Sequence, residues 1–297
     1  MGNQLVRPVR ASELASALGL AFRGADHAVN RILPLNAAVD GALSFSRTCF
    51  EHPRTDACVM IAPPGTPVAA GAVIESANPR LDFAKALNWL KACPGFVLPE
   101  LPAQIHPEAR VSPAAVIGKG ARIGKGTVVH HFVVIGDGVH IGDNCVIKSG
   151  AVIGEDGFGF ERELDGTPLR LPHLGSVSIG NRVEIGSLAT VCRGTLDDTI
   201  VEDDAKIDDH VHIGHNCKIR RGAMLSACAV LGGGVDLGEY SWVGPNATVI
   251  QQMTVGAGAL IGIGANAMRP VAPGDTLVGY PARSVASNSE NGFVKRP

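Results

Sequence analysis

The sequence predicts a mainly β protein, in which a small N-terminal α/β domain precedes a parallel β-helix built from hexapeptide repeats. The first observation is an aliphatic residue at every sixth position over most of the stretch from Ile105 to Ile261. The second is a small or β-branched residue four positions after many of these aliphatic residues. The third is composition, because 37 glycines and only 4% aromatic residues suit a narrow core with many turns. Neither a helical period nor simple strand alternation produces a six-residue repeat.

Residues 1–100 lack the repeat and are predicted to form the separate α/β domain. Ser12 is expected to cap a short helix that continues to Leu18 and is closed by Gly19. Apolar runs predict strands, and the segment that begins with Pro79 reads as an amphipathic helix with proline in its first turn. The expected strands cover residues 42–45, 57–62 and 68–74, the second helix covers 79–93, and a proline-bearing linker covers 94–107.

Residues 101–270 are predicted to form the β-helix and residues 271–297 a short C-terminal tail. In each repeat the aliphatic side chain is expected to point inward and to stack on its counterpart one coil away, so that neighbouring coils stabilise each other. Glycine often follows the aliphatic residue, and we expect it to provide the unusual backbone angles of a corner. Cys145 and Cys217 occupy the small inward position and are interpreted as core residues.

Composition excludes several classes of function. The formal net charge of −2 shows no electrostatic footprint for nucleic acid. No apolar stretch is long enough to cross a bilayer, and the N-terminus lacks the core of a signal peptide. The seven cysteines are scattered, odd in number and without a C-x-x-C pair, which is typical of reduced thiols. These features predict a cytoplasmic protein.

Two interruptions of the repeat are predicted to be loops that leave the β-helix. The first follows Ile153 and is rich in polar residues, glycine and proline, and the second, CRGTLDDTI, covers residues 192–200. Loops that leave a rigid scaffold often carry binding and catalytic residues. We therefore expect the functional site near these two insertions.

His215 is the candidate catalytic base. It lies at a corner, two positions after inward-facing Ile213, where an exposed imidazole can accept a proton near neutral pH. Asp208 is close enough in sequence to orient this ring. About one coil further, the run Gly232–Gly234 leaves backbone N–H groups open to stabilise an oxyanion.

Four long motifs resemble the UDP-3-O-(3-hydroxyacyl)glucosamine N-acyltransferase family of lipid A biosynthesis. They are GALSF (41–45), NPRLDFAKAL (78–87), SGAVIGEDGFGF (149–160) and VCRGTLDDTIVEDDAKIDDHVHIGHNCKI (191–219), so the resemblance covers nearly the whole chain. It implies a left-handed β-helix, an N-terminal uridine-binding domain and a homotrimer with active sites between the subunits. It also implies an acyl carrier protein thioester as donor, a UDP-amino sugar as acceptor, and at most peripheral membrane contact through a lipid substrate.

The resemblance also assigns roles to single residues. His215 would take the proton of the attacking 2-amino group, Asp208 would hold its imidazole, and the Gly233 amide would stabilise the oxyanion. Phe45 would stack on the uracil, and Asn216 is expected to contact substrate. A second histidine of the family is replaced here by Gln252, which is expected to bind substrate, and SRTCFE (46–51) lacks the asparagine and tyrosine that help to hold uridine. No cofactor is expected, because an acyl thioester serves as co-substrate.

Three alternatives remain open at this point. A nucleotide-amino-sugar N-acetyltransferase using acetyl-CoA would fit the same β-helix and the short tail. A zinc-dependent γ-type carbonic anhydrase would use His210, His212 and His215 as ligands, although the metal prediction is none because no partner histidine recurs one coil later. A non-enzymatic scaffold would leave both loops unexplained. Outward valines such as Val128 and Val134 need a partner surface and favour a homotrimer.

Overall fold

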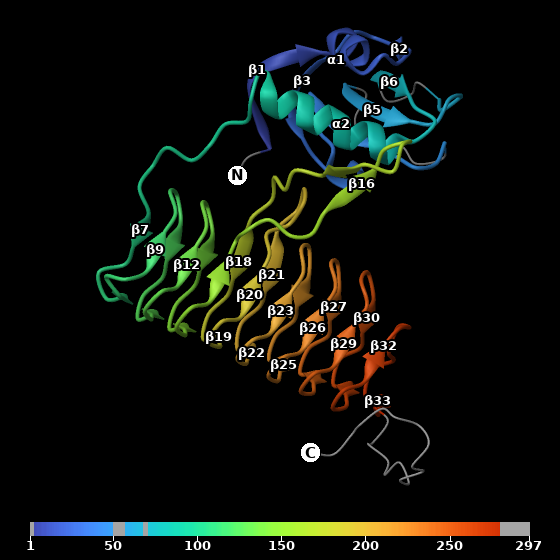
Figure 1. Ribbon diagram of the computed structural model, residues 1–297. Helices are drawn as coiled ribbons and strands as arrows, with labels where there is room; N and C mark the ends of the chain where they lie inside the picture. Colours follow the sequence, from blue (N-terminus) through green and yellow to red (C-terminus); the bar gives the residue numbers. More distant parts are fainter. Residues whose placement is uncertain (1–2, 50–56, 68–70, 280–297) are drawn as a thin grey trace, which may run out of the picture.

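The computed structural model describes residues 3–49, 57–67 and 71–279, and it shows a triangular β-helix with a smaller domain above its middle coils (Figure 1). The β-helix consists of three parallel sheets, which the chain visits in turn. We call them the first, second and third faces. Residues in neighbouring coils of one face pair in register, as Ile123 does with Ile141.

The three faces contain short strands, most of them of two residues. The first face is formed by β7 (Gln104–Ile105), β10 (Arg122–Ile123), β13 (His140–Ile141), β18 (Val177–Ile179), β21 (Thr199–Val201), β24 (Lys218–Ile219), β27 (Asp236–Leu237) and β30 (Thr254–Val255). The second face is formed by β8 (Arg110–Val111), β11 (Val128–Val129), β14 (Val146–Ile147), β19 (Glu184–Ile185), β22 (Lys206–Ile207), β25 (Met224–Leu225), β28 (Trp242–Val243), β31 (Leu260–Ile261) and β33 (Thr276–Leu277). The third face is formed by β9 (Val116–Ile117), β12 (Val134–Ile135), β15 (Val152–Ile153), β20 (Thr190–Val191), β23 (His212–Ile213), β26 (Val230–Leu231), β29 (Thr248–Val249) and β32 (Asn266–Ala267).

The interior of the β-helix follows the repeat. Ile213 and the aliphatic residues stacked with it are fully buried, and Cys145 and Cys217 are buried in the same core, as predicted. The core continues past the predicted boundary at residue 270, because β33 adds a last strand to the second face. The predicted tail therefore begins with β-helix structure, and its residues from 280 onward lie outside the described part of the chain.

The predicted reason for glycine after the aliphatic residue applies to Gly154, where φ is 93°, but is wrong for the other glycines of this kind in the described coils. Gly118 and Gly214 do not have positive φ; a side chain on either would instead meet the backbone of the next coil, at 2.5 Å from Asp137 N in the case of Gly118. The left-handed backbone conformation occurs two positions later and is often adopted by other residues, such as Asn216 with φ of 59°. Glycine after the aliphatic residue thus permits close stacking of coils.

The N-terminal domain has one mixed six-stranded sheet, in the order β1-β3-β4-β5-β6-β2. Strand β4 matches its predicted range, β5 begins one residue late, and β6 is shifted, with 68–70 of its predicted range outside the described residues. Strands β1, β2 and β3 were not predicted. The elements are β1 (Gln4–Arg10), α1 (Ala11–Leu18), β2 (Phe22–Gly24), β3 (Ala28–Ile32), the 3-10 helix η1 (Leu35–Ala37), β4 (Ala42–Phe45), β5 (Cys58–Ala62), β6 (Gly71–Glu75) and α2 (Pro79–Ala92).

The first residues of both helices differ from what was predicted: α1 does not use the predicted cap, and α2 uses a cap that was not predicted. Ser12 does not cap α1; the helix begins after Arg10, and both the amide and the hydroxyl of Ser12 donate to Asp26 at 2.9 Å. Gly19 ends α1 in the left-handed conformation, as predicted. Helix α2 begins after Asn78, whose side chain accepts from the Leu81 amide. No helix in the described part of the chain combines the length and apolar character needed to cross a membrane.

The first insertion connects the two domains. It contains a hairpin of β16 (Phe160–Arg162) and β17 (Pro168–Arg170), which lies beneath α2 (Figure 1). Arg80 on α2 forms an ion pair of 2.5 Å with Glu161, and the Asn88 side chain donates to the carbonyl of Arg170 at 2.8 Å. The N-terminal domain is therefore held over the coils that carry both insertions.

Candidate active site

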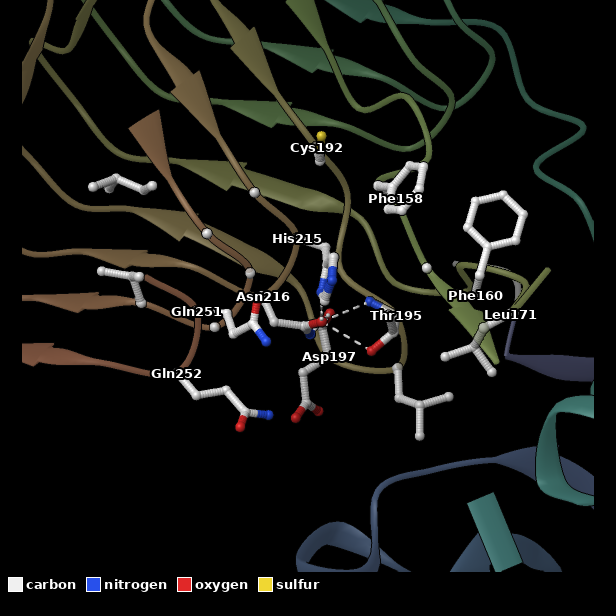
Figure 2. Close-up of a pocket in the computed structure, with 18 of the residues that line it drawn as sticks. Phe158, Phe160, Leu171, Cys192, Thr195, Asp197, His215, Asn216, Gln251 and Gln252 are labelled. Atoms are coloured by element: carbon white, nitrogen blue, oxygen red, sulfur yellow. Dashed lines mark hydrogen bonds between the residues drawn. The ribbon is translucent and has the colours of Figure 1, made fainter. Parts of the chain in front are cut away.

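His215 lies at the corner between the third and first faces, directly after β23. Ile213, two residues earlier, is buried in the core, so the corner is fixed while the imidazole points out of the β-helix. In Figure 2 the ring stands in the pocket beside Asn216 and Thr195. Gly233 and Gln251 follow at the same corner on the next coils, and the carbonyl of His215 accepts from the Gly234 amide at 2.7 Å.

Asn216 sets the tautomer of His215. The Asn216 side-chain oxygen accepts from the Thr195 amide at 3.0 Å and the Thr195 hydroxyl at 2.9 Å, while its side-chain nitrogen donates to the Asp197 carbonyl. His215 Nδ1 lies 3.0 Å from the same oxygen. Because that oxygen can only accept, Nδ1 carries a hydrogen, and Nε2 is left with a lone pair that can accept a proton. Asn216 was predicted to contact substrate, and the structure places it behind the base as the residue that orients it.

Asp208 does not orient His215, and that prediction is corrected. The Asp208 carboxylate accepts from the amides of Asp209 at 2.8 Å and Ala227 at 3.1 Å. The physical reason is the coil geometry: Asp208 follows β22 of the second face, whereas His215 follows β23 of the third face. Seven residues of sequence separation therefore place the two side chains at different corners.

Gly233 lies against the imidazole, as its proposed role requires. A side chain at this position would meet Cε1 and Nε2 of His215 at 2.6 Å, so only glycine leaves the ring in place. Among the hydrogen bonds of the described residues the Gly233 amide donates none, while the neighbouring amides of Gly232 and Gly234 donate to Val249 and His215. An unpaired N–H beside the base is the arrangement that an oxyanion donor needs.

The three histidines of the alternative zinc site do not converge. His210 lies at the corner before β23, and the side chain of His212 points outward from β23, where its Nδ1 lies 2.7 Å from the Thr190 hydroxyl. Across residues 3–49, 57–67 and 71–279, no group of three or more His, Cys, Asp or Glu residues is placed to hold a metal. This geometry offers no support for the carbonic anhydrase alternative.

A single cavity of about 1000 Å³ joins His215 to the N-terminal domain. Its walls come from the β-helix corner, from both insertions and from the segment after β4. Phe45 lines the far part of the cavity beside Arg47, and its ring lies 4.7 Å from that of Phe83. The structure thus brings Phe45, His215, Gly233, Asn216 and Gln252 to one cavity and leaves Asp208 out of it.

Gln252 and Asp197 both line this cavity (Figure 2). Gln252 has φ of 60° and its amide donates to the Gly233 carbonyl at 2.8 Å, which places its side chain two coils beyond Asn216. Asp197 was not predicted; burial raises the pKa of its carboxyl, with Lys218 opposing that effect. Its signal in the sequence was only its place within the second insertion.

His173 is a buried residue beside the base that the prediction missed. It belongs to the first insertion, and its ring lies 5.3 Å from that of His215 in an edge-on arrangement of 79°. Burial lowers the pKa of His173, and the nearby His215 lowers it further, against the opposing effect of Asp156. The sequence indicated the loop as a functional region but offered no pattern that singled out this residue.

The fold defines the class of protein to which this chain belongs. The family model "Bacterial transferase hexapeptide (six repeats)" matches residues 120–155 and 198–233. A solved UDP-N-acetylglucosamine acyltransferase of Francisella novicida is 31% identical, with a TM-score of 0.50, over 59% of this chain and 64% of that chain. A Moraxella catarrhalis UDP-N-acetylglucosamine O-acyltransferase, 24% identical with a TM-score of 0.50, shares the fold over 60% of this chain and 69% of its own. The chain is a hexapeptide-repeat transferase, and its β-helix is of the predicted left-handed type.

The curated relatives narrow the class to a family. A UDP-3-O-acylglucosamine N-acyltransferase of Janthinobacterium sp. (strain Marseille) is 36% identical over 95% of this chain and 90% of its own length. The protein of the same name from Delftia acidovorans is 39% identical over 80% of this chain and 76% of its own length. The chain belongs to the UDP-3-O-acylglucosamine N-acyltransferase family, as its motifs predicted.

Proposed function

We propose that this protein transfers an acyl group from a thioester to the 2-amino group of a UDP-linked 3-O-acylglucosamine, the acceptor named for its relatives. The observation that carries the proposal is the continuous cavity between the base His215 and the aromatic wall at Phe45. A nucleotide sugar is a ligand with two ends, and this cavity offers a different chemistry at each end. One molecule can therefore place its uracil near Phe45 and its amino group near His215.

The chemical step uses His215 and Gly233. His215 Nε2 takes one proton from the amine as the nitrogen attacks the thioester carbonyl, and the imidazolium keeps its Nδ1 hydrogen bond to Asn216. The Gly233 N–H donates to the oxyanion that forms on the carbonyl oxygen. Collapse of this intermediate forms the amide and breaks the C–S bond, and the thiolate leaves and takes up the proton that His215 holds. No cofactor enters this scheme.

The nucleotide end combines an aromatic ring with positive charge. Phe45 offers a face on which a uracil can stack, and Arg47 and Arg80 line the same part of the cavity. A guanidinium binds phosphate oxygens through two parallel hydrogen bonds. These residues support binding of a nucleoside diphosphate even though the family's asparagine and tyrosine are missing after Phe45.

A mass-spectrometric assay tests the function. The protein is incubated with UDP-3-O-acylglucosamine and either acyl carrier protein thioesters, acyl-CoA thioesters or acetyl-CoA, and the amide product is followed by mass. We expect a long-chain amide that His215→Ala forms at a rate about 100- to 10,000-fold lower. A product only with acetyl-CoA would favour the N-acetyltransferase alternative. No amide with any donor would refute the proposal.

The assembly is proposed to be a homotrimer in the cytoplasm. Exposed apolar side chains follow the second and third faces and the corner between them, including Val116 (62% exposed), Phe132 (73%) and Leu188 (56%). Such a row needs a partner surface, and a second copy of the chain presents the same row. The seven cysteines are free thiols, which suits a reducing compartment. Multi-angle light scattering tests the state: a stable monomer at micromolar concentration would refute the trimer.

A further inference from the structure

His173 stands directly behind the catalytic base and is almost removed from solvent. Its residue exposure is 5%, and its ring meets that of His215 edge-on at 5.3 Å. Two neighbours in the chain hold it in place, because Leu171 and Leu174 pack against the core of the N-terminal domain. The position of this ring is therefore fixed by both domains.

The hydrogen bonds of His173 define which nitrogen carries a hydrogen. Nδ1 lies 3.0 Å from the carbonyl oxygen of Leu171, and because a carbonyl can only accept, Nδ1 is the protonated nitrogen of the neutral ring. Nε2 is then an acceptor. It is buried and has no hydrogen-bond partner in the described part of the chain. Such an unpaired buried atom costs stability and calls for an explanation.

Two glycines of the first insertion leave room for the pair of rings. A side chain at Gly157 would lie 3.2 Å from His173 Nε2 and 3.1 Å from His215 Cδ2, and one at Gly159 would lie 2.6 Å from His173 Cε1. The insertion therefore wraps the His173 ring closely and keeps the space between the two imidazoles free. The unpaired Nε2 lies beside this space, next to the ring that gains a proton in the reaction.

We propose that His173 is a positioning residue for His215: it keeps an uncharged, unpaired Nε2 beside the base and holds the imidazole of His215 in its reactive orientation. A proton on Nε2 would place a positive charge against His215 and oppose formation of the imidazolium. The charged groups around His173 are Asp156 and Arg170 of the same insertion and His215 of the β-helix corner, and Arg170 lies 3.7 Å from Asp156. Burial lowers the pKa of His173, which favours the neutral form of its ring. This inference rests on the proposed role of His215 as base.

Two variants test the proposal. His173→Gln keeps an acceptor oxygen and a donor for the Leu171 carbonyl but cannot take a proton, whereas His173→Phe keeps the ring shape without either group. We expect His173→Gln to retain kcat within about threefold and His173→Phe to lose about 10- to 100-fold in kcat with little change in KM, the effect of a misplaced base. Equal activity of His173→Phe and wild type would overturn the proposal.

The pH profile of kcat/KM separates positioning from packing and does not depend on His173→Phe being folded. In wild type the acid limb should steepen from a slope of one to a slope of two where His173 also takes a proton, while His173→Gln should keep a slope of one. Ionisation of the substrate amine affects both proteins equally and cancels in their ratio. Identical limbs in the two proteins would refute the proposal, whereas absent wild-type activity would refute the proposed function instead. Circular dichroism over the same pH range verifies that both proteins stay folded.

Discussion

Replacing Gly233 with alanine tests the contact between the glycine and the base most directly. The new methyl carbon would lie 2.6 Å from both Cε1 and Nε2 of His215, whereas ordinary contacts begin at 3.4 Å. The backbone at Gly233 does not have positive φ, so alanine is compatible with the main chain. Relief must therefore come from a shift of the imidazole by roughly 1 Å, a displacement that can reduce turnover about 100-fold. That loss corresponds to about 2.7 kcal/mol in the activation free energy.

Steady-state kinetics measure the expected loss of turnover, and thermal unfolding measures the expected change in stability. The kcat of Gly233→Ala should fall about 100-fold, while the free energy of unfolding should change by less than about 1 kcal/mol because the ring can move into the cavity. Lys119→Ala is the matched control, since Lys119 is exposed and occupies the equivalent position after β9 on the same corner. It should leave both quantities unchanged.

A double-mutant cycle decides whether the imidazole is the group that the methyl displaces. In a His215→Ala background no ring remains at this position, so adding Gly233→Ala should cause little further loss of turnover. A further loss of the same size would refute the reasoning, because the methyl would then act on the substrate or on the oxyanion. Wild-type turnover in Gly233→Ala alone would refute it as well.

The remaining predictions concern Asn216 beside the base, Ile213 in the β-helix core, Gln252 in the cavity, and the stability of the protein at acid pH. Asn216→Ala should lower kcat by about tenfold or more because the Nδ1 hydrogen bond to the base is lost, and an unchanged kcat would remove Asn216 from the mechanism. Ile213→Asp should destabilise the β-helix by several kcal/mol, since it buries an unpaired carboxylate, and an unchanged melting temperature would contradict the burial assignment. Gln252→Ala should weaken substrate binding by roughly 1–3 kcal/mol, as measured by calorimetry. Hydrogen bonds from Arg220 lower the pKa of Asp236 below its ordinary value of 3.8, so Asp236→Asn should cost about 0.5–1 kcal/mol of stability above that pH, and the difference from wild type should vanish as the pH falls below it.

The β-helix could be predicted from the sequence because its repeat is one-dimensional. Each coil contacts mainly its neighbours, so the six-residue period alone places Ile213 in the core and His215 at a corner. The N-terminal domain lacks such a period, and the strands β1 to β3 were missed because their sequences, QLVRPVR, FRG and AVNRI, contain no long apolar run. An element was therefore predicted where its own residues form a clear apolar pattern, and it was missed where they do not.

Contacts between side chains in the site were also hard to predict from the sequence. Asp208 was linked to His215 because the two are near in sequence, but one strand of the coil separates their corners. Asn216 and Thr195 orient the base instead, and they meet only because the second insertion folds back against the next coil. A repeat predicts where a residue sits around the coil, whereas an insertion obeys no period, so its contacts can be learned only from the folded chain.

The insertions explain why a rigid β-helix can serve as an enzyme in this chain. Alone, the corner at His215 is an exposed edge with a base and an unpaired amide beside it. The first insertion packs against that edge through His173 and lines the cavity with Phe158, and its hairpin binds α2 through Arg80 and Glu161. The same segment therefore forms a wall of the cavity beside the base and contacts the domain that is proposed to hold the far end of the substrate. Glu161→Gln removes this ion pair but keeps Arg80, so it should weaken UDP binding measured by calorimetry while leaving the unfolding of the β-helix core unchanged.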